Sequence, residues 1–230
     1  MNYGYWGFDP TMIILIPALL FTMYAQFKVS STTNKYLKVR AYSGYTGEQV
    51  AKRILSVNGL NDVRVEPIGG HLSDHYDPRK KTVRLSQDVY SGTSITSISV
   101  AAHECGHAIQ HAHGYVPLNI RSSLVPVVNF ASNASWILII LGFIMSGPFL
   151  KFGILLFSLT VLFQIVTLPV EFNASSRAVT QLASLGIVDE GEKKQSRKVL
   201  TAAALTYVAA ALTAALQLLR LVLIAQRRND

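Results

Sequence analysis

Long apolar stretches without charged residues dominate the sequence and are separated by polar segments. These uncharged runs cover Thr11–Phe27, Ser122–Leu150, Phe152–Val170 and Val199–Leu219. A helix needs about 20 apolar residues to cross the hydrocarbon core of a bilayer, and each run is close to that length or longer. We therefore expect a mainly α-helical membrane protein with about four transmembrane helices, the middle two joined as a hairpin through residues 147–151.

The first apolar run has a competing interpretation as a cleaved secretory signal peptide. Such a peptide has a basic residue before its apolar core and a small-x-small cleavage site after it. The sequence has neither feature around residues 11–27, so we predict a retained helix. For the last, Ala-rich run, the alternative is a buried helix of a soluble bundle.

The segment 28–121 is the only part with the composition of a soluble protein. Within it, Thr46-Gly47-Glu48-Gln49 matches a capping box, which predicts a helix from there through Val57. This part should be a small α+β unit that packs against the membrane helices, because it is too short to bury a large core alone. The other predicted elements are strands over 62–68 and 81–86, a turn-rich loop over 71–80 and a helix over 93–112.

Composition and charge agree with a membrane location. Half of the residues are hydrophobic and 15% are charged, whereas soluble domains average about 25% charged residues. Of the 21 Lys and Arg residues, 12 lie in 28–123 and 5 in 171–198. With four spans these two regions share one side, which the positive-inside rule assigns to the cytoplasm. No basic patch with interleaved aromatic residues suggests a nucleic-acid partner.

The expected organisation has five regions. Four full spans put the basic residues after the last apolar run on the side opposite to the other basic regions, in mild conflict with the positive-inside rule. These residues leave open whether the last helix crosses fully. The regions are an N-terminal transmembrane helix (1–28), a cytoplasmic α+β unit (29–121), a transmembrane hairpin (122–170), a helix and charged loop (171–198), and a C-terminal transmembrane helix with its tail (199–230).

An H-E-x-x-H motif, His103-Glu104-Cys105-Gly106-His107, lies in the predicted helix over 93–112. Four residues turn an α-helix by roughly 400°, so the two imidazoles lie on one face and can share a zinc ion. The Glu104 carboxylate beside them can take a proton from an attacking water. The alternative is a chance match on a polar face, but the flanks are apolar and the small Gly106 leaves room beside a metal. The single cysteine, Cys105, is interpreted as a packing residue, and its isolation fits a reducing compartment.

A catalytic zinc site needs a third protein ligand, for which two residues compete. His113 stands where an extended H-E-x-x-H-x-x-G-x-x-H motif has its third His, but Gln110 replaces the glycine of that pattern. Glu171 follows the predicted membrane hairpin, which returns it to the side of the membrane that holds His103. An acidic residue at the end of a membrane span is energetically costly and therefore indicates a functional role. Glu171 is therefore preferred, and His111 and His113 are interpreted as polar interface residues.

Several stretches together resemble a known family. The order of H-E-x-x-H, membrane hairpin and then Glu171-Phe172-Asn173-Ala174-Ser175 is similar to the gluzincin-type membrane proteases, including the bacterial HtpX and eukaryotic CAAX prenyl protease families. The closer resemblance, over nearly the whole chain, is to the YugP-like family of predicted bacterial membrane zinc metallopeptidases. The stretches that carry it are residues 71–78, 82–86, 103–107 and 168–175.

This resemblance implies a gluzincin-like fold, one Zn²⁺ per chain on His103, His107 and Glu171, and Glu104 as the catalytic base. It also implies a multi-pass protein of a bacterial membrane, whereas the cytoplasmic position of the site is expected from the distribution of Lys and Arg. The wider gluzincin pattern has an aspartate four residues after the third ligand, where this sequence has Ser175. Either Ser175 orients a ligand imidazole in its place or another group does so.

The expected activity is that of a zinc endopeptidase acting on a peptide or membrane-protein substrate, with a role in membrane protein quality control by resemblance only. The alternatives are an inactive zinc-binding scaffold and a transporter or channel, the latter disfavoured because the spans hold almost no charged residues. Arg177, Tyr207 and His113 are candidate oxyanion donors, in that order. A strand at Val83-Arg84-Leu85 is expected to present an edge to the substrate backbone. The sequence does not indicate an oligomeric state.

Overall fold

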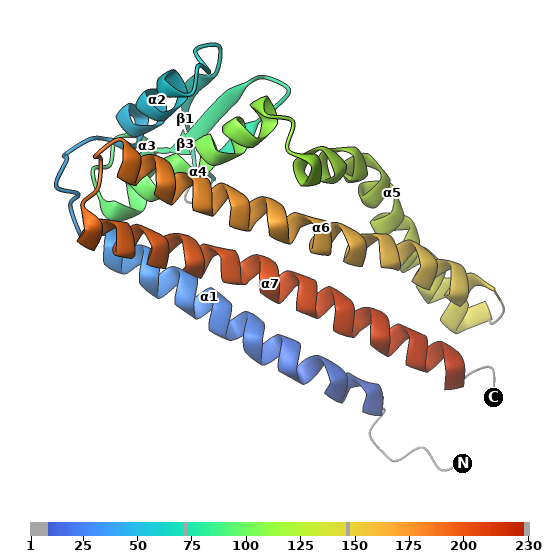
Figure 1. Ribbon diagram of the computed structural model, residues 1–230. Coiled ribbons are helices and arrows are strands. Elements are labelled where there is room, and N and C mark those ends of the chain that lie inside the picture. Colours follow the sequence, from blue (N-terminus) through green and yellow to red (C-terminus); the bar gives the residue numbers. More distant parts are fainter. Residues whose placement is uncertain (1–8, 71–72, 146–147, 228–230) are drawn as a thin grey trace.

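A computed structural model describes residues 9–70, 73–145 and 148–227 (Figure 1). Long helices form most of the molecule, and a small sheet with two short helices gathers at one end. The described elements are η1 (Pro10–Leu15), α1 (Ile16–Leu37), α2 (Gly47–Val57), β1 (Arg64–Ile68), β2 (His75–Asp77), β3 (Thr82–Ser86), α3 (Gln87–Tyr90), α4 (Ile95–Ala112), α5 (Val116–Met145), α6 (Phe149–Ser184) and α7 (Glu190–Arg227).

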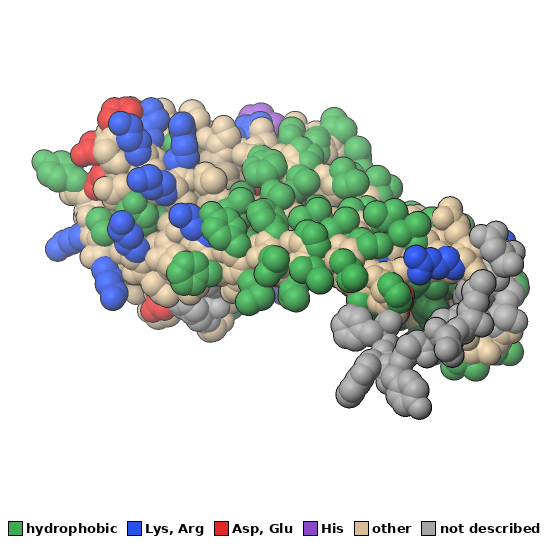
Figure 2. Space-filling view, turned by 90° about the horizontal axis from the view of Figure 1, so that it is seen from below, with side chains coloured by type: hydrophobic (Ala, Val, Ile, Leu, Met, Phe, Trp, Pro, Cys, Tyr) green, Lys and Arg blue, Asp and Glu red, His purple; other side chains and the backbone are tan. Residues whose placement is uncertain are grey.

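Four helical segments of the described chain are long and apolar enough to cross a membrane, as the sequence predicts: η1 with α1, and α5, α6 and α7. In Figure 1, α1, α7 and α6 run side by side, and α5 packs along α6. Hydrophobic side chains cover these helices in Figure 2, whereas most of the Lys and Arg side chains in that view gather at the end where α7 begins. This separation is that of a membrane protein with one basic end.

All four long helices extend beyond the apolar runs that predict them, and α6 and α7 extend furthest. Pro169 and Glu171 are expected to end a span and open a separate segment, but α6 continues through both to Ser184. A proline removes one backbone donor, a loss that neighbouring groups in a packed transmembrane helix can offset. The charged stretch 189–198 likewise belongs to α7. Both helices thus run from the predicted bilayer directly into the polar unit.

An ion pair accounts for the basic residue near the end of α7. Arg220 Nη2 lies 2.9 Å from Asp9 Oδ2, and Arg220 Nε donates to Thr11 Oγ1 at 3.1 Å. Because Asp9 and Thr11 lie at the start of the first span, the charge of Arg220 is compensated where the two helices end together. Arg220 is therefore compatible with an α7 that crosses fully.

The small sheet has one strand more than the sequence predicts. Its strand order is β1-β3-β2, with β1 parallel and β2 antiparallel to β3. β2 lies in the stretch predicted to be only a turn-rich loop; it is three residues long, too short for an alternating pattern to reveal. β3 is the central strand along Thr82–Arg84, so the prediction that Val83 and Arg84 present a free edge to substrate was wrong. The reason is that β2 pairs with β3 on the side opposite to β1. Leu85 pairs with β1 alone among the described residues.

The polar unit shares one core with the long helices, as its small size predicts. The capping box is present as expected: Thr46 Oγ1 accepts from Gln49 N, and Gln49 Oε1 accepts from Thr46 N. The α4 helix lies at the centre of this core. Its neighbours there include Ile54 of α2, Leu85 of β3, Leu182 of α6 and Leu200 of α7, all buried. A metal centre on α4 is therefore held by both parts of the protein.

Candidate metal centre

Two imidazoles converge on the face of α4 that is turned toward α6. The helix begins at Ser94, whose hydroxyl caps it by accepting from Ser97 N at 3.0 Å. The Nε2 atoms of His103 and His107 lie 3.2 Å apart, as the four-residue spacing predicts. Both side chains are nearly buried. The local sequence alone therefore places two nitrogen donors together.

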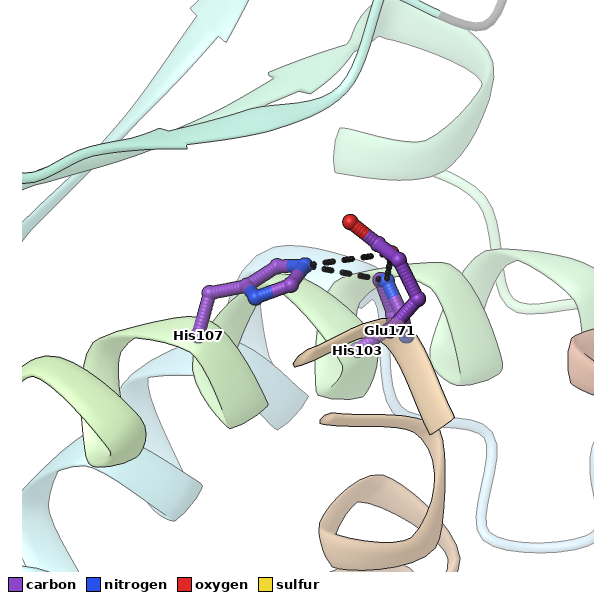
Figure 3. A group of neighbouring side chains, drawn as sticks. All are labelled: His103, His107 and Glu171. Atoms are coloured by element: carbon purple, nitrogen blue, oxygen red, sulfur yellow. Dashed lines mark hydrogen bonds and ion pairs between the residues drawn. The ribbon is translucent and has the colours of Figure 1, made fainter. Parts of the chain in front are cut away.

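Glu171 of α6 completes a group of three possible metal ligands (Figure 3). Its Oε2 lies 3.3 Å from His103 Nε2 and 3.6 Å from His107 Nε2. The carboxylate side chain is only 3% exposed, and Oε2 accepts no hydrogen bond from the described residues. A buried carboxylate oxygen needs compensation. Two imidazole nitrogens and one carboxylate oxygen are a ligand set that suits zinc with one position left open, so these residues fit the ion.

The hydrogen bonds behind the imidazoles turn their Nε2 atoms toward the centre. Gln110 Nε2 donates to the Val170 carbonyl, which leaves Gln110 Oε1 as the acceptor for His107 Nδ1 at 3.1 Å. Neutral His107 then has its proton on Nδ1 and a free electron pair on Nε2. Ser175 Oγ lies 3.2 Å from His103 Nδ1 and is placed to do the same for that ring. Outer partners of this kind fix the orientation of metal-ligating imidazoles.

Two carboxylates, those of Glu171 and Glu104, act on the imidazole of His107. Burial disfavours its charged form, but the adjacent Glu171 carboxylate, together with the charge of Glu104, outweighs burial and raises the pKa of His107. A proton and a metal ion therefore compete for the same nitrogen. Glu104 itself is buried, and its charge also acts on Tyr207 of α7.

Comparison with known proteins points to the same metal. A family model described as "Putative neutral zinc metallopeptidase" matches residues 11–226. The chain belongs to this zinc metallopeptidase family. It is 52% identical over 220 residues to the "Putative membrane protease YugP" of Bacillus subtilis (strain 168), covering 95% of this chain and 98% of that protein. No solved structure matches. The sequence resemblance to a YugP-like family is thus confirmed, and the family description names zinc.

Arg121 borders the possible ligand group, and the sequence interpretation missed it. Its Nη1 lies 3.5 Å from Glu171 Oε1, the carboxylate oxygen that does not face both imidazoles. Sequence reasoning counted Arg121 only as a topological charge. Its position directly before the uncharged run 122–150 could have indicated such a contact. A cation at the end of a span can face the interior of the protein as readily as it faces lipid headgroups.

The three candidate oxyanion donors lie in different surroundings. Tyr207 lies beside Glu171, Glu104 and Arg121 and therefore borders the ligand group. Arg177 Nε donates instead to Asn173 Oδ1 at 2.7 Å. His113 Nδ1 lies 2.8 Å from the Ile109 carbonyl of its own helix. The structure thus brings Tyr207 to the centre, whereas the hydrogen bonds of Arg177 and His113 are made with other groups.

Proposed function

We propose that this membrane protein is a zinc-dependent endopeptidase, with one zinc ion held by His103, His107 and Glu171 and with Glu104 as the general base. The single observation that supports it best is the buried, hydrogen-bond-free Oε2 of Glu171 between two imidazole Nε2 atoms, next to a second buried carboxylate. A purely structural site does not need Glu104, because a general base adds nothing to metal binding.

Zinc in this position supplies Lewis-acid catalysis by polarising the scissile carbonyl and acidifying water. Glu104 accepts the proton of the attacking water and later returns it to the leaving amine. Gln110 and Ser175 hold the imidazoles in place through their Nδ1 atoms. Tyr207 is the preferred oxyanion donor, because of the three candidates it is the one that borders Glu104 and Glu171.

An extended substrate would add to β2, because β3 is paired on both sides along Thr82–Arg84. Among the described residues β2 pairs with β3 alone, and the hydroxyl of its Tyr76 lies 2.9 Å from Nδ1 of His111 on α4. Peptides commonly bind to an exposed sheet edge as an added strand whose main chain supplies the affinity. Replacing single substrate amides by esters should raise KM at the positions that pair with β2. Equal KM values throughout the series would exclude this arrangement.

The basic end of the molecule supports a site on the cytoplasmic side of a cell membrane. We infer that the substrates are peptides or membrane-protein segments exposed at that surface, and that clearance of damaged membrane proteins is the corresponding role.

The test compares Glu104→Gln with wild type for zinc content and for cleavage of an unfolded substrate such as casein. The expected result is one zinc per chain in both proteins and loss of at least about a hundredfold in kcat for the variant, as for loss of a general base. Glu190→Gln, an exposed position, is the matched control and should cleave normally. Zinc binding without cleavage by wild type would favour the inactive scaffold, and equal cleavage by Glu104→Gln would exclude the proposed base.

A further inference from the structure

A concave groove with a strongly basic lining lies between α1 and α7. It has a volume of about 700 Å³, which is within the range of small-molecule sites. Its polar and apolar lining includes no acidic residue. The cationic side chains that line it are Lys28, Lys35, Lys194, Arg197 and Lys198.

These cations have no carboxylate partner among the described residues. Other basic residues of the same region do: Lys193 Nζ lies 2.9 Å from Glu190 Oε1, whereas the adjacent Lys194 pairs with no acid in the part of the chain that the structure describes. The ammonium group of Lys35 lies over the aromatic ring of Tyr36, 5.5 Å from its centroid. Like charges that converge on one concavity repel one another, so an anionic ligand would stabilise the groove.

The positive-inside rule explains only part of this arrangement. It places Lys and Arg on the cytoplasmic side, but it does not require cations from two helices far apart in the sequence to line one groove. It also does not require those cations to lack acidic partners, which are present elsewhere on the same end of the molecule. A binding site accounts for both features.

The surface of α1 beside the groove continues as an apolar stripe. Leu20, Tyr24 and Lys28 follow one another at four-residue intervals and therefore share one face of the helix. Leu20 and Tyr24 are 61% and 52% exposed within a segment predicted to lie in the bilayer, so they face lipid chains. A ligand with an anionic headgroup and apolar chains would match the cationic groove and the stripe together. Inorganic phosphate would use only the groove.

We propose that this groove binds the headgroup of an anionic phospholipid from the cytoplasmic leaflet. Basic pockets between transmembrane helices are a recurrent form of lipid recognition. The bound headgroup would hold α1 against α7. α1 is also attached to the first turn of the metal-bearing helix, because Thr96 of α4 donates to the Thr33 carbonyl at 3.1 Å. The site lies apart from the metal centre and does not depend on the proposed catalysis.

The experiment is native mass spectrometry of the full chain in detergent, titrated with dioleoyl phosphatidylglycerol or dioleoyl phosphatidylcholine. Wild type should bind the anionic lipid more tightly. The variant Lys194→Gln/Arg197→Gln/Lys198→Gln should lose this preference by roughly fivefold for each charge removed. The matched control, Lys52→Gln/Arg53→Gln/Lys80→Gln, changes the net charge equally outside the groove and should keep the preference.

A second variant, Lys28→Gln/Lys35→Gln, tests the same groove from the α1 side in case the triple variant does not fold, which its zinc content and cooperative unfolding reveal. Equal binding of the two lipids to wild type would overturn the proposal. An equal loss in the control variant would overturn it as well, because the preference would then follow net charge. Inorganic phosphate that binds as tightly as the anionic lipid would show that the apolar chains add no affinity, and would overturn the lipid assignment.

Discussion

A Cβ atom at Gly106 would lie 2.6 Å from the carbonyl oxygen of Ala174. Glycine at this position therefore lets the backbones of α4 and α6 cross in direct contact. Ala174 lies three residues after Glu171 and directly before Ser175, so the crossing sets the distance of both side chains from the imidazoles. The interpretation that Gly106 leaves room beside a metal was wrong, because the α6 backbone occupies that space.

Replacing Gly106 by alanine should push α6 away from α4. We expect a loss of about 1–3 kcal/mol in the free energy of unfolding, the usual effect of overpacking a core. Zinc binding should weaken at the same time, because Glu171 moves with α6. Denaturant unfolding and zinc content after dialysis check both effects. Gly69→Ala is the control, since a Cβ there meets no atom within 4 Å. Normal zinc binding by Gly106→Ala would show that the crossing does not position the ligands.

Removal of the proposed third ligand should release the metal. Glu171→Ala leaves two imidazoles and no anionic donor, so its zinc affinity should fall by more than the roughly 10–100-fold that is typical for loss of an outer partner. His113→Ala is the matched control, because the His113 ring is hydrogen-bonded to its own helix backbone. Metal content measured after mild chelation shows whether Glu171 or His113 is the third ligand. Zinc retained by Glu171→Ala and lost by His113→Ala would favour the extended motif.

Ser175 offers a weaker partner for His103 than the aspartate found at this position in the wider gluzincin pattern. Ser175→Ala should lower zinc affinity by about tenfold, and Ser175→Asp should preserve or raise it, because a carboxylate makes the stronger hydrogen bond to an imidazole. The neighbouring and exposed Ser176 provides the control, Ser176→Ala. Competition with a metal-responsive dye gives the affinities. Identical values for the two alanine variants would show that Ser175 does not support His103.

Features set by neighbouring residues could be predicted from the sequence. The helix Gly47–Val57 follows from its capping box, and the facing imidazoles of α4 follow from their spacing. The four apolar helices follow from hydrophobic length, and the basic end follows from the distribution of charge. Each of these depends on a few adjacent positions or on composition, so no tertiary information is needed.

Features set by contacts between distant segments could not be predicted. β2 exists because β3 offers it an edge, and this pairing in turn makes β3 the central strand. In the sequence, Gln110 is notable only because it replaces the glycine of the extended motif. In the structure, its amide links His107 to the Val170 carbonyl of another helix. Arg121 reaches Glu171 because α5 and α6 pack together. None of these contacts leaves a periodic signal in the sequence.

The only cysteine of the chain should be chemically inert in the folded protein. Cys105 is fully buried, and burial, with a further contribution from the nearby Glu104 charge, raises the pKa of its thiol. The thiolate is the reactive form, so a maleimide should label the native protein slowly and the denatured protein quickly. Mass spectrometry of timed samples measures both rates. Rapid labelling under native conditions would show that the α4 core opens readily.

This inert background allows the membrane orientation to be tested with single introduced cysteines. Gln226 lies at the far end of α7 and is exposed, and Lys52 is exposed on α2 in the polar unit. If the basic end is cytoplasmic, a membrane-impermeant maleimide added to intact cells should label Gln226→Cys and spare Lys52→Cys. Cell lysis should then make both accessible. The unmodified chain, with Cys105 alone, is the blank. The reverse pattern on intact cells would place the metal centre outside the membrane, and labelling of neither cysteine would mean that α7 does not cross fully.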